Sequence, residues 1–114
     1  MPDALRRIAS IDGLVAAYVV DRDRGKVEGF SRAGSQLDLE LDAINNGEVL
    51  GLAQTVIATL DSAEQIRTLL FALGAGYHVI RPSSRDRGRF LYLILDRIDG
   101  NLGLLLHLLE DAGP

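Results

Sequence analysis

The chain of 114 residues has no cysteine and no tryptophan, and it contains only three prolines and two histidines. Without cysteine, a disulfide framework, a thiolate zinc site and a thiol nucleophile are excluded, and a reducing cytoplasmic compartment is expected. His78 and His107 are too few for the usual metal cluster and lack an i, i+4 partner histidine. We therefore expect no metal and no cofactor, with His78 on a strand face and His107 on the polar side of a helix.

Long hydrophobic runs are also missing. Runs such as Leu14 to Val20 and Phe90 to Leu95 are far short of the roughly 20 residues that span a bilayer, and Met1 to Ser10 lacks the apolar core of a secretory signal. With 12 basic and 16 acidic residues, the net charge of −4 disfavours nucleic acid or an anionic membrane as the main ligand. The length predicts a single domain over residues 1–114.

A catalytic serine is poorly supported. Residues 29–33 nearly match a nucleophile elbow around Ser31, but Ala33 stands where the strained turn requires a second glycine. Asp96 and His107 follow in the order found in hydrolases, an order that so short a chain matches easily by chance. The sequence therefore predicts that the protein is not an enzyme.

Leucine and valine are abundant in two segments that have helical spacing. From Glu48 to Leu60 the apolar residues cover an arc of about 160°, wider than the roughly 100° stripe that a monomeric helix needs. Asp99 to Ala112 is similarly rich in leucine. Because a folded monomer tolerates little contiguous exposed apolar surface, the excess predicts contact with another chain.

Strands are indicated in the first third and near the end of the chain. Leu14 to Val20 and Arg89 to Leu95 are apolar at both parities, as expected for strands covered on both faces. Asp21 to Gly25 predicts a hairpin turn, and Lys26 to Phe30 alternates like an edge strand. A short helix is expected from Pro2 to about Ser10.

Two segments allow alternatives. Residues 31–46 begin the long helix or form a mobile lead-in to it, and the helix proper is placed at about Glu48 to Leu60. Gly51 within it costs about 1 kcal/mol relative to alanine, which close helix–helix approach would offset. Residues 62–74 have the spacing of a helix, but residues 74–76 also suit a hairpin between two strands.

Four arginines gather within nine residues, at Arg81, Arg85, Arg87 and Arg89. Such a loop can grip phosphate, RNA or an acidic protein surface, and the last fits best in an acidic protein without stacking aromatics there. The alternative is an ordinary solvated hairpin. On this basis the four arginines are candidate partner-binding residues.

The element order is helix, two strands, helix, three strands, helix. It predicts an α+β fold with helices on both faces of one five-stranded, largely antiparallel sheet, a three-layer α/β/α sandwich. Two stretches are diagnostic: residues 11–21 with the turn at Asp23 and Gly25, and residues 90–96 followed by residues 99–104. In these stretches the chain resembles the roadblock/dynein light chain family over almost its entire length.

The resemblance implies a profilin-like fold in which residues 62–73 form a strand. It also implies dimers in which the long middle helices pack together and the third strands pair. Carried over to this chain, the dimer surface comprises Val49, Leu50, Ala53, Val56, Ile57, Leu60, Leu69 and Phe71. Leu104, left over on the last helix, is a further candidate partner contact.

Proteins of this family act as non-catalytic adaptors, and some bind Ras-like small GTPases and modulate their nucleotide cycle. The resemblance therefore implies a homodimeric adaptor or regulator of a small GTPase. A rival is a small-molecule sensor with a pocket between sheet and helix. The sequence supplies mostly bulky aliphatic side chains, which fill such a space rather than leave it open.

Overall fold

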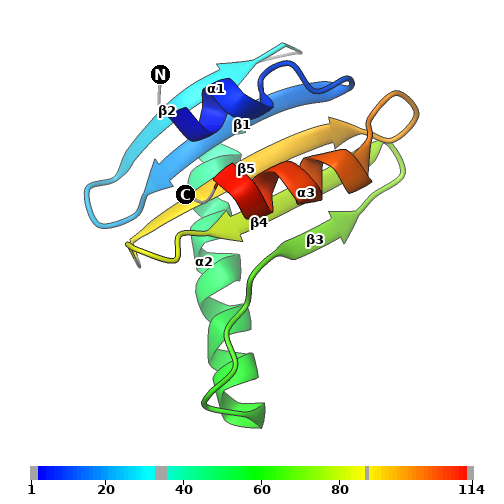
Figure 1. Ribbon diagram of the computed structural model, residues 1–114. Coiled ribbons are helices and arrows are strands. Elements are labelled where there is room, and N and C mark those ends of the chain that lie inside the picture. The colour runs from blue at the N-terminus through cyan, green and yellow to red at the C-terminus, as the bar shows by residue number, and fades with distance from the viewer. Residues whose placement is uncertain (1–2, 33–35, 87, 113–114) are drawn as a thin grey trace.

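A computed structural model describes residues 3–32, 36–86 and 88–112 of the chain. The element order matches the prediction (Figure 1). The elements are α1 (Asp3–Ile8), β1 (Leu14–Asp21), β2 (Lys26–Ser31), α2 (Gln36–Leu60), β3 (Leu69–Ala72), β4 (Gly76–Pro82), β5 (Arg89–Asp96) and α3 (Leu102–Ala112).

One sheet contains all five strands in the order β2-β1-β5-β4-β3, and every neighbouring pair is antiparallel. The strands that are apolar at both parities, β1 and β5, lie inside the sheet, because each must be covered on both faces. The alternating β2 lies at one edge, as predicted. The other edge is the short strand β3.

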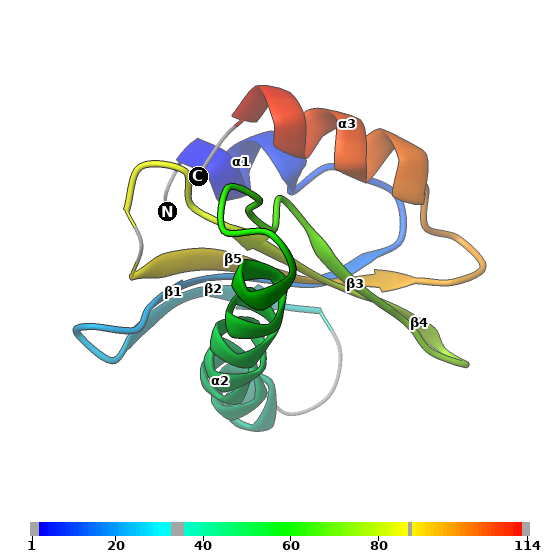
Figure 2. The same cartoon turned by 90° about the horizontal axis from the view of Figure 1, so that it is seen from below.

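Helices cover both faces of the sheet, which confirms the three-layer prediction. Figure 2 shows α1 and α3 together on one face and α2 on the opposite face. Within the described ranges, none of the helices is long and apolar enough to cross a membrane.

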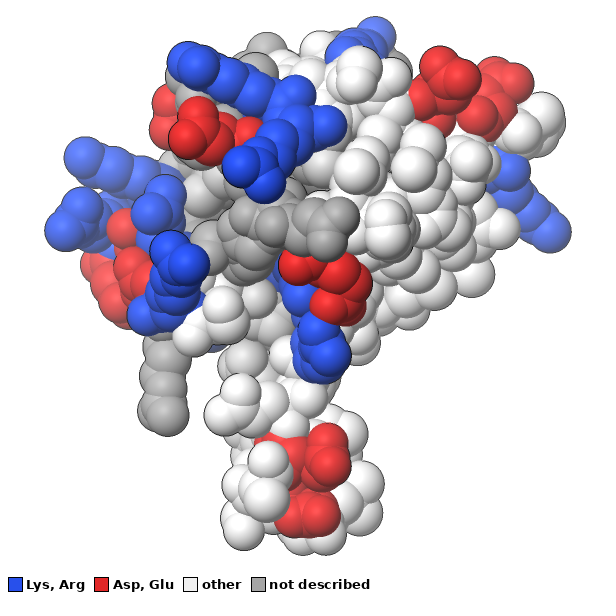
Figure 3. Space-filling model, in the orientation of Figure 1, with Lys and Arg blue, Asp and Glu red and all other residues white. Residues whose placement is uncertain are grey.

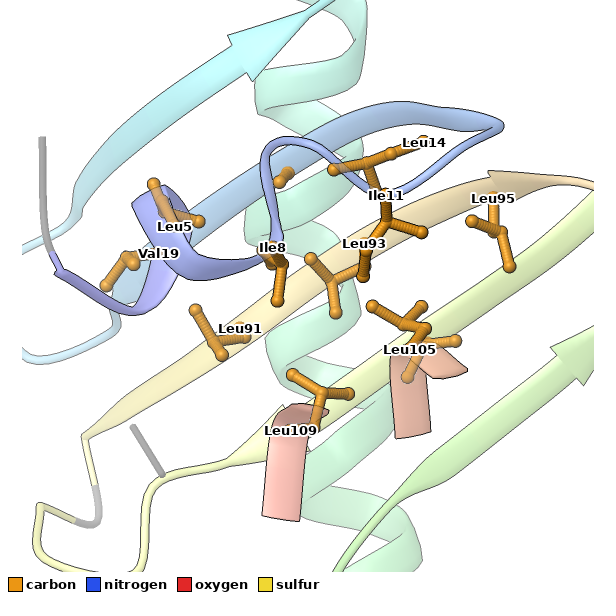
Figure 4. Packing of buried hydrophobic residues seen from close by; sticks show 12 residues of the cluster. Leu5, Ile8, Ile11, Leu14, Val19, Leu91, Leu93, Leu95, Leu105 and Leu109 are labelled. Carbon is orange, nitrogen blue, oxygen red and sulfur yellow. The ribbon is translucent and has the colours of Figure 1, made fainter. Parts of the chain in front are cut away.

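The core on the α1–α3 face is built from aliphatic side chains (Figure 4). Leu105 and Leu109 of α3 pack with Leu5 and Ile8 of α1 over Leu93 of β5, and all five are buried. Each buried side chain of this kind contributes about 1.5–3 kcal/mol relative to an exposed one. The leucines after Asn101 are therefore mostly core.

The two diagnostic stretches of the sequence meet at the junction of Gly13 and Gly100. The Asp96 N–H donates a hydrogen bond to the Gly13 carbonyl over 2.7 Å. Gly13 has φ of 80°, and a Cβ there would lie 2.4 Å from the backbone nitrogen of Gly100. Both the φ and the close approach require glycine, so this junction explains why glycine stands at Gly13.

The long helix begins earlier than the predicted Glu48, because α2 starts at Gln36. Leu39, Ala43 and Leu50 pack on the sheet at intervals of four and seven residues, which is one face of a helix. The polar residues between them obscured this spacing in the sequence. Residues 31–46 therefore belong largely to α2 rather than to a separate lead-in.

Of the ambiguous segment, only residues 69–72 form a strand, whereas residues 62–68 form neither a strand nor the helix that the spacing favours. β3 pairs with β4 through four residue pairs, from Leu69 opposite Ile80 to Ala72 opposite Tyr77. Leu69 and Phe71 pack against the core on the α2 face. Strand pairing and packing thus override local helix propensity, as the family resemblance implied.

Candidate functional site

The C-terminal part of α2 is poorly covered by its own chain. In Figure 1 this helix crosses the sheet and extends well beyond it. Residues 49–60 include no charged side chain, and Figure 3 shows this protruding part as largely uncharged, with acidic residues at its tip. The exposed fractions are 41% for Val49, 69% for Leu52, 53% for Val56 and 78% for Leu60.

Part of this apolar surface forms a regular stripe along α2. The stripe begins with two polar residues, Asp42 and Asn46, and continues with the apolar residues Val49, Ala53, Val56 and Leu60, separated by alternating steps of four and three residues. Such spacing places side chains on one line of the helix and is the spacing of a helix–helix seam. Asp42 contacts Tyr92 of β5, which in turn contacts His78 of β4, so the stripe lies on the side of α2 nearest β4 and β3.

Strand β3 adds a second apolar wall. Leu69 and Phe71 are half-buried on the α2 face, and β3 has no neighbouring strand on its outer side. An exposed edge of this kind offers backbone N–H and C=O groups to another strand. We define the α2–β3 surface as Val49, Leu52, Ala53, Val56, Leu60, Leu69 and Phe71.

Leu50 was expected on this surface, but the structure places it in the core. It is 3% exposed and packs with Ile80, Phe90 and Tyr92. The reason is its angular position, because Leu50 follows Val49 by 100° around the helix, toward the sheet. Ile57 is half-buried and lines an open concavity of about 900 Å³ beside residues 62–67, rather than the stripe.

Gly51 lies beside a side chain of its own chain, Arg22. A Cβ on Gly51 would lie 3.3 Å from Nη2 of Arg22, and a Cβ on Gly47 would lie 3.1 Å from Nε of the same arginine. Because neither glycine has a side chain, the Arg22 side chain can lie directly against this part of α2. They occupy a different side of α2 from the stripe.

A chain of three polar side chains links α2 to the sheet. The Tyr92 hydroxyl lies 2.6 Å from Oδ2 of Asp42, and Nδ1 of His78 lies 2.7 Å from the same hydroxyl. An ionised carboxylate only accepts, so Tyr92 donates to Asp42 and accepts from His78. Nδ1 of His78 therefore carries a proton, and in the neutral ring Nε2 is left as an acceptor.

The surroundings change the proton affinity of these groups. Burial and the hydrogen bond to Asp42 raise the pKa of Tyr92, so it stays a neutral donor at ordinary pH. Burial lowers the pKa of His78 below its ordinary value of 6.5, and the charge of Asp42 opposes this only in part. The network therefore favours neutral His78 at pH 7.

This network was not among the predicted sites. Its one sequence signal was Tyr92 within a buried strand, because a buried tyrosine hydroxyl usually has a hydrogen-bond partner. The partner itself lies 50 residues away in the sequence. His78 does lie on a strand face, as expected, but it is tied to α2.

Arg81 is not a free partner-binding residue, contrary to the prediction. It lies in β4, is only 8% exposed, and its Nη1 contacts Thr68 Oγ1 at 2.9 Å and Glu110 Oε1 at 3.3 Å. Arg67 pairs with the same Glu110 carboxylate. Arg81 therefore connects β4, the segment before β3 and the end of α3.

The other arginines of the loop occupy a surface of mixed charge. Arg85 and Arg89 are exposed, whereas Arg87 lies outside the described residues. Arg89 shares a concavity of about 420 Å³ with Asp21, Asp23 and other charged residues of both signs. Figure 3 shows basic and acidic side chains intermixed at this end of the molecule, so the described arginines make no uniform basic patch.

Two remaining candidates have simple positions. Leu104 is 43% exposed on α3, as expected for the leucine left over from the core.

Asp96, the supposed acidic partner of Ser31, caps a turn, because its Oδ1 accepts hydrogen bonds from the N–H groups of Ile98 and Asp99. This role explains the aspartate without catalysis.

The space between α2 and the sheet is filled by side chains. Tyr18, Phe90 and Tyr92 are buried there together with Leu50 and Ile80. A sensor would need a pocket in this layer, and the packing supplies large side chains instead. The α2–β3 surface is therefore a better candidate for a binding site than the layer between α2 and the sheet.

Comparisons with solved structures agree with this architecture. A roadblock/LC7 domain from Streptomyces avermitilis superposes with a TM-score of 0.75 at 11% identity, covering 94% of this chain and 85% of that chain. MglB from Myxococcus xanthus gives a TM-score of 0.72 at 15% identity, covering 94% and 82%. An MglB structure with a tetrameric arrangement gives 0.73 at 15% identity, covering 96% and 79%.

Comparison by sequence finds no match, either among protein-family models or among curated proteins. The structural matches cover 94% to 96% of this chain. This chain therefore has the roadblock/LC7 fold.

Proposed function

We propose that the protein is a non-catalytic homodimeric adaptor whose α2–β3 surface is covered by a second copy, and that the dimer binds and regulates a Ras-like small GTPase. The observation that carries the proposal is the uncharged, exposed part of α2 beside the free edge of β3. Contiguous exposed apolar surface of this kind is typical of protein–protein interfaces.

A second copy of the same chain suits this surface for two reasons. The stripe through Val49, Ala53, Val56 and Leu60 has the spacing of a seam between two helices, and Ala53 is small enough for close approach. The free edge of β3 can pair with an identical edge about a two-fold axis, as isologous interfaces do. The tetrameric arrangement of one similar MglB structure adds support for self-association.

The partner class rests on the family resemblance in residues 11–25 and 90–104, and the fold is consistent with it. An adaptor needs no catalytic group of its own, since it acts by holding the switch loops of the GTPase in one arrangement. Arg85, Arg89 and Leu104 are exposed and remain candidates for that contact.

The experiment is a binding titration with purified Ras-like GTPases from the same organism, each loaded with GDP or with a non-hydrolysable GTP analogue. Isothermal titration calorimetry should show binding that prefers one nucleotide state, with two copies of this chain in the complex. Absence of binding to every such GTPase in both states would contradict the adaptor role.

A matched pair of variants connects binding to the dimer. Val56→Glu places a charge on the stripe, whereas Ala58→Glu places the same charge on an exposed position of the same helix, about 160° away around its axis. Val56→Glu should weaken GTPase binding strongly, and Ala58→Glu should leave it within about twofold. Equal effects of both variants would argue against a role for the stripe.

A further inference from the structure

His78 lies next to the α2–β3 surface, so its exposure to water would change if a second copy covered that surface. It stands opposite Phe71 in the β3–β4 pairing and packs against Tyr92, with 5.8 Å between the two ring centroids. It is half-buried in the single chain. A second copy seated on Phe71 and on the α2 stripe would remove further water from the imidazole.

The hydrogen bonds of His78 leave one nitrogen for protonation. Nδ1 already donates to Tyr92, so an added proton must go to Nε2. Among the described residues, no hydrogen-bond partner of Nε2 is present. A proton there places a full positive charge at the margin of an apolar surface.

The groups that face His78 compensate this charge only weakly. From α2 it faces Asp42, which is reached through the Tyr92 hydroxyl and is already used as an acceptor. From β5 it faces Tyr92, a neutral group, and from β3 it faces Phe71, which has no charge. Burial consequently outweighs the attraction of Asp42, and the neutral ring is favoured.

We propose that His78 makes self-association pH-dependent: the neutral ring permits a second copy to cover the α2–β3 surface, and protonation at Nε2 opposes it. The inference rests on the proposed homodimer and adds its regulation. Because the dimer favours neutral His78 more than the monomer does, association is at full strength above the pKa of His78 in the monomer, which burial places below the ordinary value of 6.5, and it weakens as the pH falls through that pKa.

The test is the dimer dissociation constant from sedimentation equilibrium between pH 7.5 and pH 5.5. The wild-type constant should rise about tenfold over this range, which corresponds to 1.4 kcal/mol. His78→Asn keeps a side-chain N–H near the position of Nδ1 but does not titrate, so its constant should stay within about twofold. His107→Asn removes the other, exposed histidine and should behave like wild type.

A second readout does not depend on the folding of a variant. The His78 ring, followed by NMR in the wild-type protein, should titrate at lower pH at concentrations above the dissociation constant than below it. A wild-type dimer with a pH-independent constant, an unchanged pH response in His78→Asn, or equal titration of the ring in both states would overturn this inference alone. A monomer at every pH would overturn the homodimer itself.

Discussion

Tyr92 is the residue that connects the long helix to the strands. Its hydroxyl contacts both Asp42 and His78, so three side chains from α2, β5 and β4 depend on one oxygen. In a buried setting, removal of a shared partner leaves the other groups without a hydrogen bond, and this costs more than the bond itself contributes. The network should therefore stabilise the fold as well as orient His78.

Tyr92→Phe should lower the free energy of unfolding by about 1–3 kcal/mol, because the Asp42 carboxylate and His78 Nδ1 each lose a buried partner. Urea denaturation measures this change. Tyr77→Phe, at a half-buried tyrosine on β4, is the matched control and should stay within about 0.5 kcal/mol of wild type. Equal stability of Tyr92→Phe and wild type would show that the network contributes nothing.

The junction of Gly13 and Gly100 allows a second comparison at this scale. Gly13→Ala meets both a positive φ and backbone atoms at 2.4 Å, whereas Gly25→Ala meets a φ of 64° with nothing within 4 Å. The first variant should therefore lose clearly more stability than the second, which should lose about 1–2 kcal/mol. Similar melting temperatures for the two variants would contradict the close approach.

At the scale of elements, α2 has two parts with different surroundings. Its turns up to residue 50 pack on β1, β2 and β5 through Leu39, Ala43 and Leu50. Its last turns leave the sheet, where Leu52, Val56 and Leu60 are exposed. Tertiary packing stabilises the first part, and the proposed second copy would stabilise the last part.

Hydrogen exchange should separate these two parts. In Val56→Glu, amides of residues 52–60 should exchange at least about tenfold faster than in wild type, because the last turns lose the packing that a second copy supplies. Amides of β5 should be unchanged and serve as the internal reference. Identical protection of residues 52–60 in both proteins would mean that no second copy covers them.

The elements differ in how far the sequence predicts them. Strands apolar at both parities, such as Leu14–Val20, were placed well because burial on both faces leaves a strong pattern. The start of α2 was missed because its core-facing residues are few and separated by polar ones. Only the family resemblance resolved β3, since its strand conformation depends on pairing with β4 rather than on local propensity.

The candidate site was predictable only in outline. The excess of apolar residues in α2 was visible, but the depth of Leu50 depends on which side of the helix meets the sheet. Arg81 looked like part of a basic loop, yet its carboxylate partner Glu110 lies 29 residues further along the chain. Long-range partners such as these leave no local pattern.

At the scale of the whole molecule, α1 and α3 cover one face of the sheet (Figure 2), whereas α2 crosses the other face and its last turns extend beyond the sheet (Figure 1). This asymmetry leaves the α2–β3 surface as an apolar corner formed by a helix and a sheet edge. The same surface of a second copy can cover both elements at once, since α2 can pack against α2 and the edge of β3 can pair with β3. The central claim is that a second copy occupies this corner.

The mass in solution tests this claim most directly. Sedimentation equilibrium at pH 7.5 and micromolar concentration should give twice the chain mass of 12.4 kDa for wild type and for Ala58→Glu. Val56→Glu should give the mass of one chain, because an unpaired charge in a desolvated seam costs about 3 kcal/mol or more. A wild-type mass of one chain, or a Val56→Glu variant that remains fully dimeric, would contradict the account.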